Sequence, residues 1–343
     1  MKNANKILAC TAALLTASLL AACGSTPADS AASTADTTPT ESAAADTAEE
    51  EAADNAESTA PVSFTGPTLQ DIRDANDATA LINTYGKVGL KETSYDADGN
   101  VTFTVNTSAE QSDGSSNVVS ITTMQAEDGG TSTYLSTLVQ NDTVCASLYL
   151  YHNPDDASDE KSVTFMPQSD FDASAAPYIS FPKNEIEAQS CEASMQDDML
   201  VLETTTDVRT QGAGVYTTVY YADPDTLIVK SVVSSYVDEN GDSTGYELYE
   251  YTYGDEVQLV TADRDLVSEA LPADTSLTCD LTIYFNYDQD DTDKQEYHVA
   301  KDFSVYASST KAPYMYSDPE LQNHAYDINV TGDTATVYLS AKW

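Results

Sequence analysis

Residues 215–236 read Val-Tyr-Thr-Thr-Val-Tyr-Tyr-Ala-Asp-Pro-Asp-Thr-Leu-Ile-Val-Lys-Ser-Val-Val-Ser-Ser-Tyr. Two runs rich in Val, Tyr and Thr, at 215–221 and 227–236, lie on either side of the turn dipeptide Asp223-Pro224, and their composition is typical of strands. Because the connection between the runs is short, it favours an antiparallel hairpin.

Further runs of the same composition continue this pattern between residues 101 and 253. Their bounds are 101–105, 118–124, 133–139, 144–151, 162–165, 200–205 and 247–253. Turn dipeptides such as Asp98-Gly99 and Asn240-Gly241 separate several of them, and no alternation of strand and helix calls for a parallel sheet. The predicted fold class is therefore mainly β with minor α, built on an antiparallel sheet.

Helical patterns stand at both ends of this run of strands. Residues 68–71, Thr-Leu-Gln-Asp, form a capping-box pattern and precede apolar residues at roughly helical spacing up to Tyr85. A second, short helix is expected at 263–271, where Pro272 ends it.

Several strands are apolar on both faces. In residues 144–151 one face carries Leu148 and Leu150, while the other carries Tyr149 and Tyr151. In a strand with one face in water, apolar residues alternate with polar ones. These strands are apolar on both faces, so each face needs other residues or a ligand to cover it. Either the helix near residue 75 and the long loops cover the second face, or that face lines an apolar, ligand-sized cavity.

The segment 220–230, Tyr-Tyr-Ala-Asp-Pro-Asp-Thr-Leu-Ile-Val-Lys, together with the first helix and the antiparallel run, resembles the LolA-like lipoprotein carriers. The resemblance covers about residues 64–275. It implies a curved antiparallel sheet, an incomplete β-barrel or half-barrel, with a covering helix and an apolar ligand in its concavity. That family binds its ligand through a generic apolar surface, so the resemblance assigns no ligand-binding residue.

Residues 276–343 restart the strand pattern at 281–287, 296–299, 303–307 and 335–341. The ending 329–343, Asn-Val-Thr-Gly-Asp-Thr-Ala-Thr-Val-Tyr-Leu-Ser-Ala-Lys-Trp, resembles internalin-type B-repeats, which close on Tyr-Ala-Lys-Trp; Ser340 is an insertion into that ending. The resemblance implies a small β-grasp-like C-terminal module of the kind found in bacterial surface proteins. The alternative is that these strands extend one larger sheet.

The amino terminus has the pattern of a lipoprotein signal peptide at residues 1–22. Lys2 and Lys6 precede an uncharged apolar run at 7–20, which is too short to span a bilayer as a helix. Residues 20–24, Leu-Ala-Ala-Cys-Gly, resemble the lipobox of bacterial lipoproteins. The resemblance implies lipidation of Cys23, with acyl chains such as palmitate, and anchoring at the extracytoplasmic face of the cell membrane. An ordinary secretory signal with a nearby cysteine is the alternative.

Residues 23–63 predict a disordered acidic linker. They consist mainly of Ala, Ser, Thr, Pro, Asp and Glu, without Lys, Arg or an aromatic residue, and so offer little apolar surface to bury. An Ala-rich acidic helix at about 43–56 is the alternative. The whole chain carries 57 acidic against 14 basic residues, and this balance argues against a nucleic-acid partner.

Residue patterns for catalysis are missing from the sequence, so no enzyme activity and no cofactor are expected. His152, His298 and His324 are isolated, which argues against a catalytic zinc site. The acidic loops 96–100 and 288–293 raise calcium binding as an alternative, but neither has the spacing of an EF-hand.

Cys145, Cys191 and Cys279 remain after the lipobox cysteine, so at most one disulfide can form among them. A Cys145–Cys191 bridge is one arrangement, and buried free thiols are the other.

These patterns predict a non-enzymatic, lipid-anchored lipoprotein that binds, carries or senses an apolar small molecule or lipid in a sheet concavity. The alternative function is adhesion or interaction with an envelope or surface protein through the C-terminal module. The expected domains are 1–22, 23–63, 64–275 and 276–343.

Overall fold

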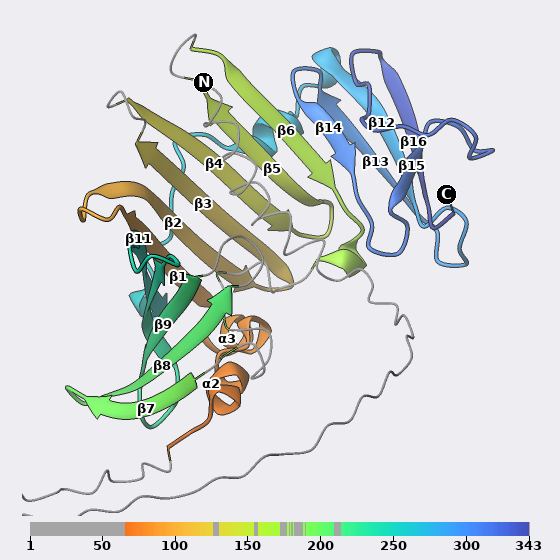
Figure 1. The fold of residues 1–343 in the computed structure, drawn as a ribbon. Helices are drawn as coiled ribbons and strands as arrows, with labels where there is room; N and C mark the ends of the chain where they lie inside the picture. Colours follow the sequence, from red (N-terminus) through yellow and green to blue (C-terminus); the bar gives the residue numbers. More distant parts are fainter. Residues whose placement is uncertain are drawn as a thin grey trace, which may run out of the picture. The chain divides into compact units, whose positions relative to one another are not determined.

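In the described part of the chain, twelve strands form one large sheet (Figure 1). The computed structural model describes residues 66–342 except 126–129, 154–156, 172–176, 178, 180, 182–187, 189 and 209–213. The strands are β1 (Lys87–Tyr95), β2 (Val101–Ser112), β3 (Ser115–Gln125), β4 (Thr131–Gln140), β5 (Cys145–His152), β6 (Asp159–Phe165), β7 (Ser190–Gln196), β8 (Met199–Val208), β9 (Gly214–Ala222), β10 (Val229–Val237), β11 (Ser243–Tyr253) and β14 (Ser304–Ala307). Their order is β14-β6-β5-β4-β3-β2-β1-β11-β10-β9-β8-β7, and the sheet is curved without closing into a barrel.

Neighbouring strands pair antiparallel, as the sequence predicts, with one exception. β14 pairs parallel with β6, so the sheet is mixed. The predicted hairpin is β9–β10, in which Tyr220 lies opposite Val232. Its second strand begins at Val229 rather than at 227, because Asp223 holds the preceding turn. The Asp223 carboxylate accepts hydrogen bonds from the backbone N–H groups of Asp225 and Thr226.

The sequence patterns did not indicate β1, although this strand joins the two halves of the sheet by pairing with both β2 and β11. Its composition is mixed, and it contains Gly89. A Cβ atom at Gly89 would clash with Oγ1 of Thr252 on β11, so a larger residue at this position would force the Thr252 side chain to move. The edge strand β7 was also not predicted.

Two short helices replace the single long helix expected near residue 75. They are α2 (Leu69–Ala75) and α3 (Ala78–Tyr85), and the predicted capping box at Thr68 and Asp71 is present. The helix is interrupted because Asn76 caps the end of α2 and the Asp77 side chain accepts from the backbone N–H of Ala80 in α3.

A second sheet contains β12 (Thr278–Phe285), β13 (Asp293–Ala300), β15 (Tyr314–Tyr316) and β16 (Thr334–Ser340), in the order β13-β12-β16-β15. Its central pair, β12 and β16, is parallel, and the other pairs are antiparallel. This is the small C-terminal β module that the sequence predicts, although β14 leaves it to join the large sheet. The division of the chain at residues 275 and 276 stays a prediction.

The shorter helical segments lie in connections between strands. The second predicted helix is α4 (Leu266–Ala270), which begins after its cap Asp265, and three single 3₁₀ turns are η1 (Gln168–Asp170), η3 (Gly254–Glu256) and η4 (Thr275–Leu277). In the described part of the chain, no helix combines the length and the apolar composition needed to cross a membrane.

The two faces of the large sheet pack against different partners. We call the face that α2 and α3 contact the helix face; its buried residues include Val88, Ala109, Leu202 and Tyr220. On the opposite face, side chains of β4, β5 and β6 pack with α4 and with the inner face of the second sheet. The buried residues Leu148 and Leu150 of β5 belong to this opposite-face core, whereas Tyr149 and Tyr151 lie on the helix face, away from α2 and α3.

Candidate functional site

The helix face has a covered end and an end rich in aromatic residues. Helices α2 and α3 pack against the end where β1 begins and β11 finishes, around Val88 and Tyr253. At the other end, strand register places further residues on the same face, and we call them the aromatic end. They are Phe103, Val105, Thr122, Met124, Tyr134, Tyr149, Tyr151, Tyr216, Tyr236 and Tyr249.

The tyrosine rings of the aromatic end contact one another. The ring centroids of Tyr134 and Tyr151 are 4.6 Å apart and nearly parallel, and those of Tyr134 and Tyr149 are 6.0 Å apart. Both Tyr134 and Tyr149 are half-buried. Burial, with a contribution from Tyr151, raises the pKa of Tyr134 to about 12, so this phenol is neutral at physiological pH. The surface therefore presents uncharged aromatic rings with hydroxyl groups at their edges.

Two carboxyl groups lie on the same face. Glu92 is directly opposite Tyr249, and Glu247 is on the same strand as Tyr249, two residues away. The Tyr249 hydroxyl donates a hydrogen bond to Oε2 of Glu247 at 2.6 Å. Burial, and then repulsion from Glu247, raises the pKa of Glu92 to about 7. A carboxyl group in this state can accept or donate a hydrogen bond to a polar group of a bound molecule.

A cationic group lies near the covered end of the helix face. Arg73 is on α2, and its Nη2 atom is buried without a hydrogen-bond partner in the described structure. The nearby Tyr220 is fully buried, with its ring stacked on Phe181 at 4.9 Å. Burial raises the pKa of Tyr220, and the positive charge of Arg73 opposes this shift. The covered end thus combines apolar rings with the positive charge of Arg73 on α2 and with Lys230, whose ammonium group lies 5.2 Å from the centroid of the Tyr253 ring.

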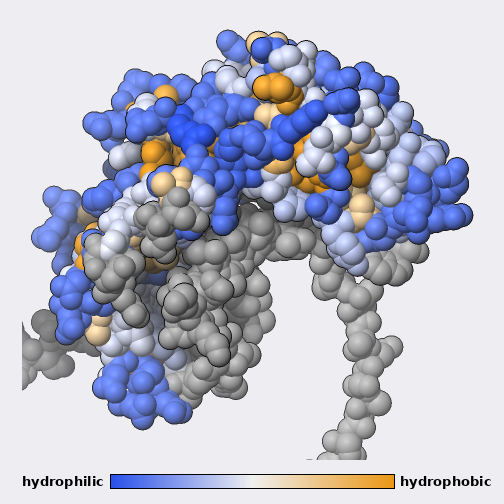
Figure 2. Space-filling model, turned by 90° about the horizontal axis from the view of Figure 1, so that it is seen from above, coloured by the Kyte–Doolittle hydropathy of each residue, from blue (hydrophilic) through white to orange (hydrophobic). Residues whose placement is uncertain are grey.

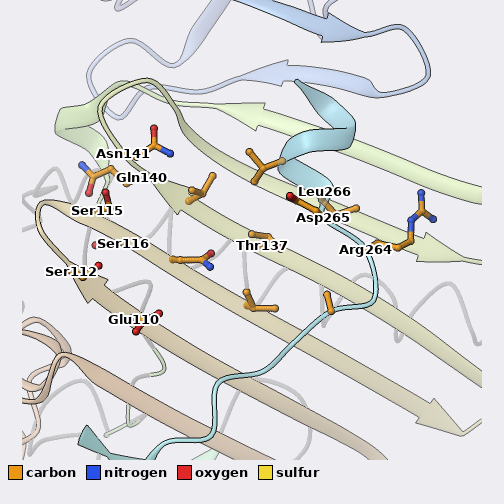
Figure 3. A pocket seen from close by; sticks show the side chains of 15 residues that line it. Glu110, Ser112, Ser115, Ser116, Thr137, Gln140, Asn141, Arg264, Asp265 and Leu266 are labelled. Atoms are coloured by element: carbon orange, nitrogen blue, oxygen red, sulfur yellow. The ribbon is translucent and has the colours of Figure 1, made fainter. Parts of the chain in front are cut away.

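The opposite face of the sheet has a hollow of about 370 Å³ between strands β2–β4 and the segment 262–267 (Figure 3). Serine, threonine and amide side chains line much of it, including Ser115, Asn117 and Thr137. This hollow is not the apolar cavity that strands with two apolar faces suggested. Polar and apolar residues both line it, and it lies on the face of the sheet opposite to the aromatic end. Helices α2 and α3 cover one part of the helix face, around Val88 and Tyr253. On the opposite face, the segment 262–267 after β11 lies over strands β2–β4.

Arg264 at this hollow is held by two carboxylates. Its Nε atom donates to Oε1 of Glu269 at 2.8 Å and its Nη1 atom donates to Oδ2 of Asp159 at 2.5 Å. Asp265 is occupied as the cap of α4, where it accepts from the backbone N–H of Ser268. Arg264 and Asp265 therefore stabilise the local structure, and Glu110, which also lines the hollow, pairs with Lys87 at 3.4 Å.

The three histidines lie apart, as the sequence predicts. His152 contacts Asp159 at 2.8 Å, His298 contacts Asp280 at 2.8 Å, and His324 packs edge-on against Tyr316 and Tyr326. Within the described ranges, no group of three or more His, Cys, Asp or Glu side chains could hold a metal ion.

The two acidic loops considered for calcium are explained by local hydrogen bonds and ion pairs. The Asp96 carboxylate accepts from the backbone N–H groups of Asp98 and Asn100, which is the turn expected there. In the second loop, Asp291 pairs with Lys311 at 2.7 Å and Asp288 accepts from the backbone N–H of Ala341.

The cysteines do not form the Cys145–Cys191 bridge. Cys145 on β5 is a buried free thiol, and burial raises its pKa to about 12. Cys279 on β12 is also buried and free, whereas Cys191 is exposed on the edge strand β7. Cys23, the predicted lipidation site, lies outside the described residues.

No protein-family model matches the chain, and no curated protein matches it. Among solved structures, it is similar to a domain from Vibrio parahaemolyticus that is described as an outer membrane lipoprotein-sorting protein domain. The two are 8% identical, the likeness covers 55% of this chain and 92% of that one, and the TM-score is 0.21. The neighbour is of the lipoprotein-sorting kind that the sequence resembles, but a likeness of this size carries no argument about function. The resemblance to B-repeats stays a prediction.

The sequence pattern predicted that Tyr149 and Tyr151 lie on a second apolar face. It did not predict that Phe103, Met124 and Glu92 share that face. The alternation of residues along β2 and β4 was the available signal. It does not say which strands are neighbours: the pairs β2–β3, β3–β4 and β4–β5 bring Phe103, Met124 and Tyr149 to one surface, and β1 adds Glu92 between β2 and β11.

Proposed function

We propose that the protein binds an apolar small molecule or lipid against the aromatic end of the helix face, without catalysing a reaction. The observation that carries this proposal is the set of half-buried apolar and aromatic side chains on one sheet face, Phe103, Val105, Met124, Tyr134 and Tyr149 among them. Such side chains leave apolar area that a ligand can remove from water, at about 25 cal/mol per Å². Figure 2 shows hydrophobic patches among mainly hydrophilic residues on the surface seen from above.

The polar groups of this face would orient a ligand rather than supply most of its binding energy. Glu92 and the hydroxyl groups of the tyrosines offer hydrogen bonds beside the rings, and Arg73 on α2 offers a positive charge. An apolar chain with one polar or acidic end fits this distribution of groups. The chemistry of the face thus favours ligands with an apolar body and one polar end, and a lipid is one molecule of this class.

A pair of neighbouring threonines on β3 tests the proposal with a matched control. Thr122 pairs with Val105 and Tyr134 on the helix face, whereas Thr123 points to the opposite face, and both are half-buried. The chain from Gly24 onward would be analysed by native mass spectrometry for co-purifying molecules and titrated with the neutral dye Nile red. We expect Thr122→Glu to abolish most dye uptake and Thr123→Glu to retain it. Absence of both dye uptake and co-purifying mass would contradict the proposal.

We also propose that Cys23 carries the lipid anchor and that the folded part lies outside the cytoplasm. The lipobox-like residues 20–24 support this proposal. The test is phase partition of the full-length chain, expressed in a bacterial host, in a detergent that separates on warming. We expect the protein in the detergent phase and the Cys23→Ser variant in the aqueous phase or as unprocessed precursor. A mature Cys23→Ser variant that still partitions into detergent would contradict lipidation at this residue.

A further inference from the structure

The outer face of the second sheet carries a group of stacked tyrosines. Residues along β12 alternate between buried positions such as Ile283 and Phe285 and partly exposed positions such as Thr282 and Tyr284. The buried set packs toward the large sheet, so the other set forms an outer face. Strand pairing places Tyr338 of β16 beside Tyr284 on that face.

Three of these rings form one aromatic cluster, which we call the tyrosine cluster: Tyr284, Tyr287 and Tyr338. The centroids of Tyr284 and Tyr338 are 5.1 Å apart with an interplanar angle of 6°. Tyr287 meets both rings edge-on, with centroid distances of 5.7 Å and 4.7 Å. None of the three is fully buried, so their outward parts are accessible to another molecule.

Charge around the cluster favours a cation. The ammonium group of Lys294 lies over the Tyr284 ring, 6.0 Å from its centroid, at the outer limit of a cation–π contact, and it also pairs with Glu296. Asp318 and Glu320 closely follow Tyr316, which pairs with Tyr338 on β16. Their charges contribute to the raised pKa of Tyr338, after the effects of burial and of the two other tyrosines. Glu320 is exposed and has no ion pair in the described structure. A cation placed beside Tyr338 would therefore meet both an aromatic ring and an unpaired carboxylate.

We propose that the tyrosine cluster, with Glu320 beside it, binds a cationic segment of a partner protein through lysine or arginine side chains. Aromatic rings attract cations through the negative charge at their faces, and nearby carboxylates add to this attraction. A neutral segment gains neither contribution, and an acidic segment would in addition be repelled by the acidic surface of the chain. This proposal concerns the second sheet alone and does not depend on ligand binding at the aromatic end.

The test uses the chain from Gly24 onward, which retains every described residue, and an octalysine peptide in isothermal titration calorimetry. Octa-acetyl-lysine, which lacks the charge, is the peptide control. The double variant Tyr284→Leu/Tyr338→Leu removes the rings without changing the net charge, and Tyr284→Phe/Tyr338→Phe keeps them. Tyr246→Leu is the matched protein control, because Tyr246 also belongs to a stacked pair, 4.5 Å from Tyr95 on the large sheet.

We expect the leucine double variant to bind octalysine about fivefold more weakly, and the phenylalanine double variant and Tyr246→Leu to bind like the wild type. Glu320→Gln should weaken binding as well. Circular dichroism and urea unfolding would establish that each variant is folded. Equal affinity of the folded leucine and wild-type chains would show that net charge alone attracts the peptide and would overturn the proposal. Absence of binding to the wild-type chain at low salt would also overturn it.

Discussion

The backbone N–H of Val229 donates a hydrogen bond to Oδ1 of Asn76 at 2.9 Å, across 153 residues of sequence. The Nδ2 atom of Asn76 donates to the carbonyl groups of Ile72 and Leu227, each at 2.8 Å. Asn76 is buried, and Val229 is completely so. One carboxamide thus ends α2 and attaches it to the start of β10, which places the helices on the sheet.

Replacing Asn76 by Ala should lower the free energy of unfolding by about 2–4 kcal/mol, because it leaves the buried N–H of Val229 and the carbonyl of Leu227 without a partner. Urea denaturation followed by circular dichroism measures this change. Asn106→Ala, at an exposed position of β2, is the control, and we expect it to change stability by less than about 0.5 kcal/mol. Similar losses in the two variants would contradict the role of the Asn76 side chain.

Glu92 should make stability fall as the pH rises from 4.5 to 7. Its pKa is about 7 in the folded chain and near 4.5 in the unfolded chain, so the folded state binds the proton more tightly. Ionisation above pH 7 therefore costs folding free energy. We expect Glu92→Gln to be more stable than the wild type by about 3 kcal/mol at pH 8 and nearly equal to it at pH 4.

Urea denaturation at several pH values measures this difference. Glu192→Gln, at an exposed position of the edge strand β7, should keep the wild-type profile. If Glu92→Gln gives no gain at pH 8, the carboxyl is hydrated in the folded chain and the proposed burial effect is absent.

Cys191 should react with a thiol reagent in the folded chain, and Cys145 and Cys279 should not. Cys191 is exposed, while the other two are buried and burial raises the pKa of both thiols. Ellman's reagent should modify one thiol of the native chain from Gly24 onward and three after unfolding in guanidinium. The folded Cys191→Ser variant should give no rapid reaction. Fewer than three thiols in the unfolded, unreduced protein would instead reveal a disulfide.

Arg264→Lys should destabilise the protein by about 1 kcal/mol at low salt, although the charge is kept. The two contacts of the guanidinium with Glu269 and its contact with Asp159 connect α4 to β6, and an ammonium group cannot reproduce the paired geometry. The loss should shrink in 1 M NaCl because salt screens the remaining charge pair. Lys91→Gln removes the exposed pair with Glu250 and should cost less than about 0.5 kcal/mol.

Much of the strand content could be predicted from the sequence because segments rich in Val, Tyr and Thr are recognisable as strands from their local composition. The hairpin around Asp223-Pro224 and the capping box at Thr68 are local patterns of this kind, and both are confirmed. β1 was not predicted because its own composition is not typical of a strand. Its pairing with β2 on one side and β11 on the other makes it one. The break between α2 and α3 also depends on a distant partner, since Asn76 caps α2 and binds the start of β10.

The mainly β class, the antiparallel hairpins and the presence of strands in 276–343 follow from the sequence alone. These depend on residues close together in the chain, whose side-chain period and turn chemistry can be read directly. Three properties depend on tertiary contacts: the pairing of β14 with β6, the division of the helix face into a covered and an aromatic end, and the burial that raises the pKa of Glu92. Those properties arise from contacts between residues far apart in the chain, and a local pattern does not specify which distant strands will meet.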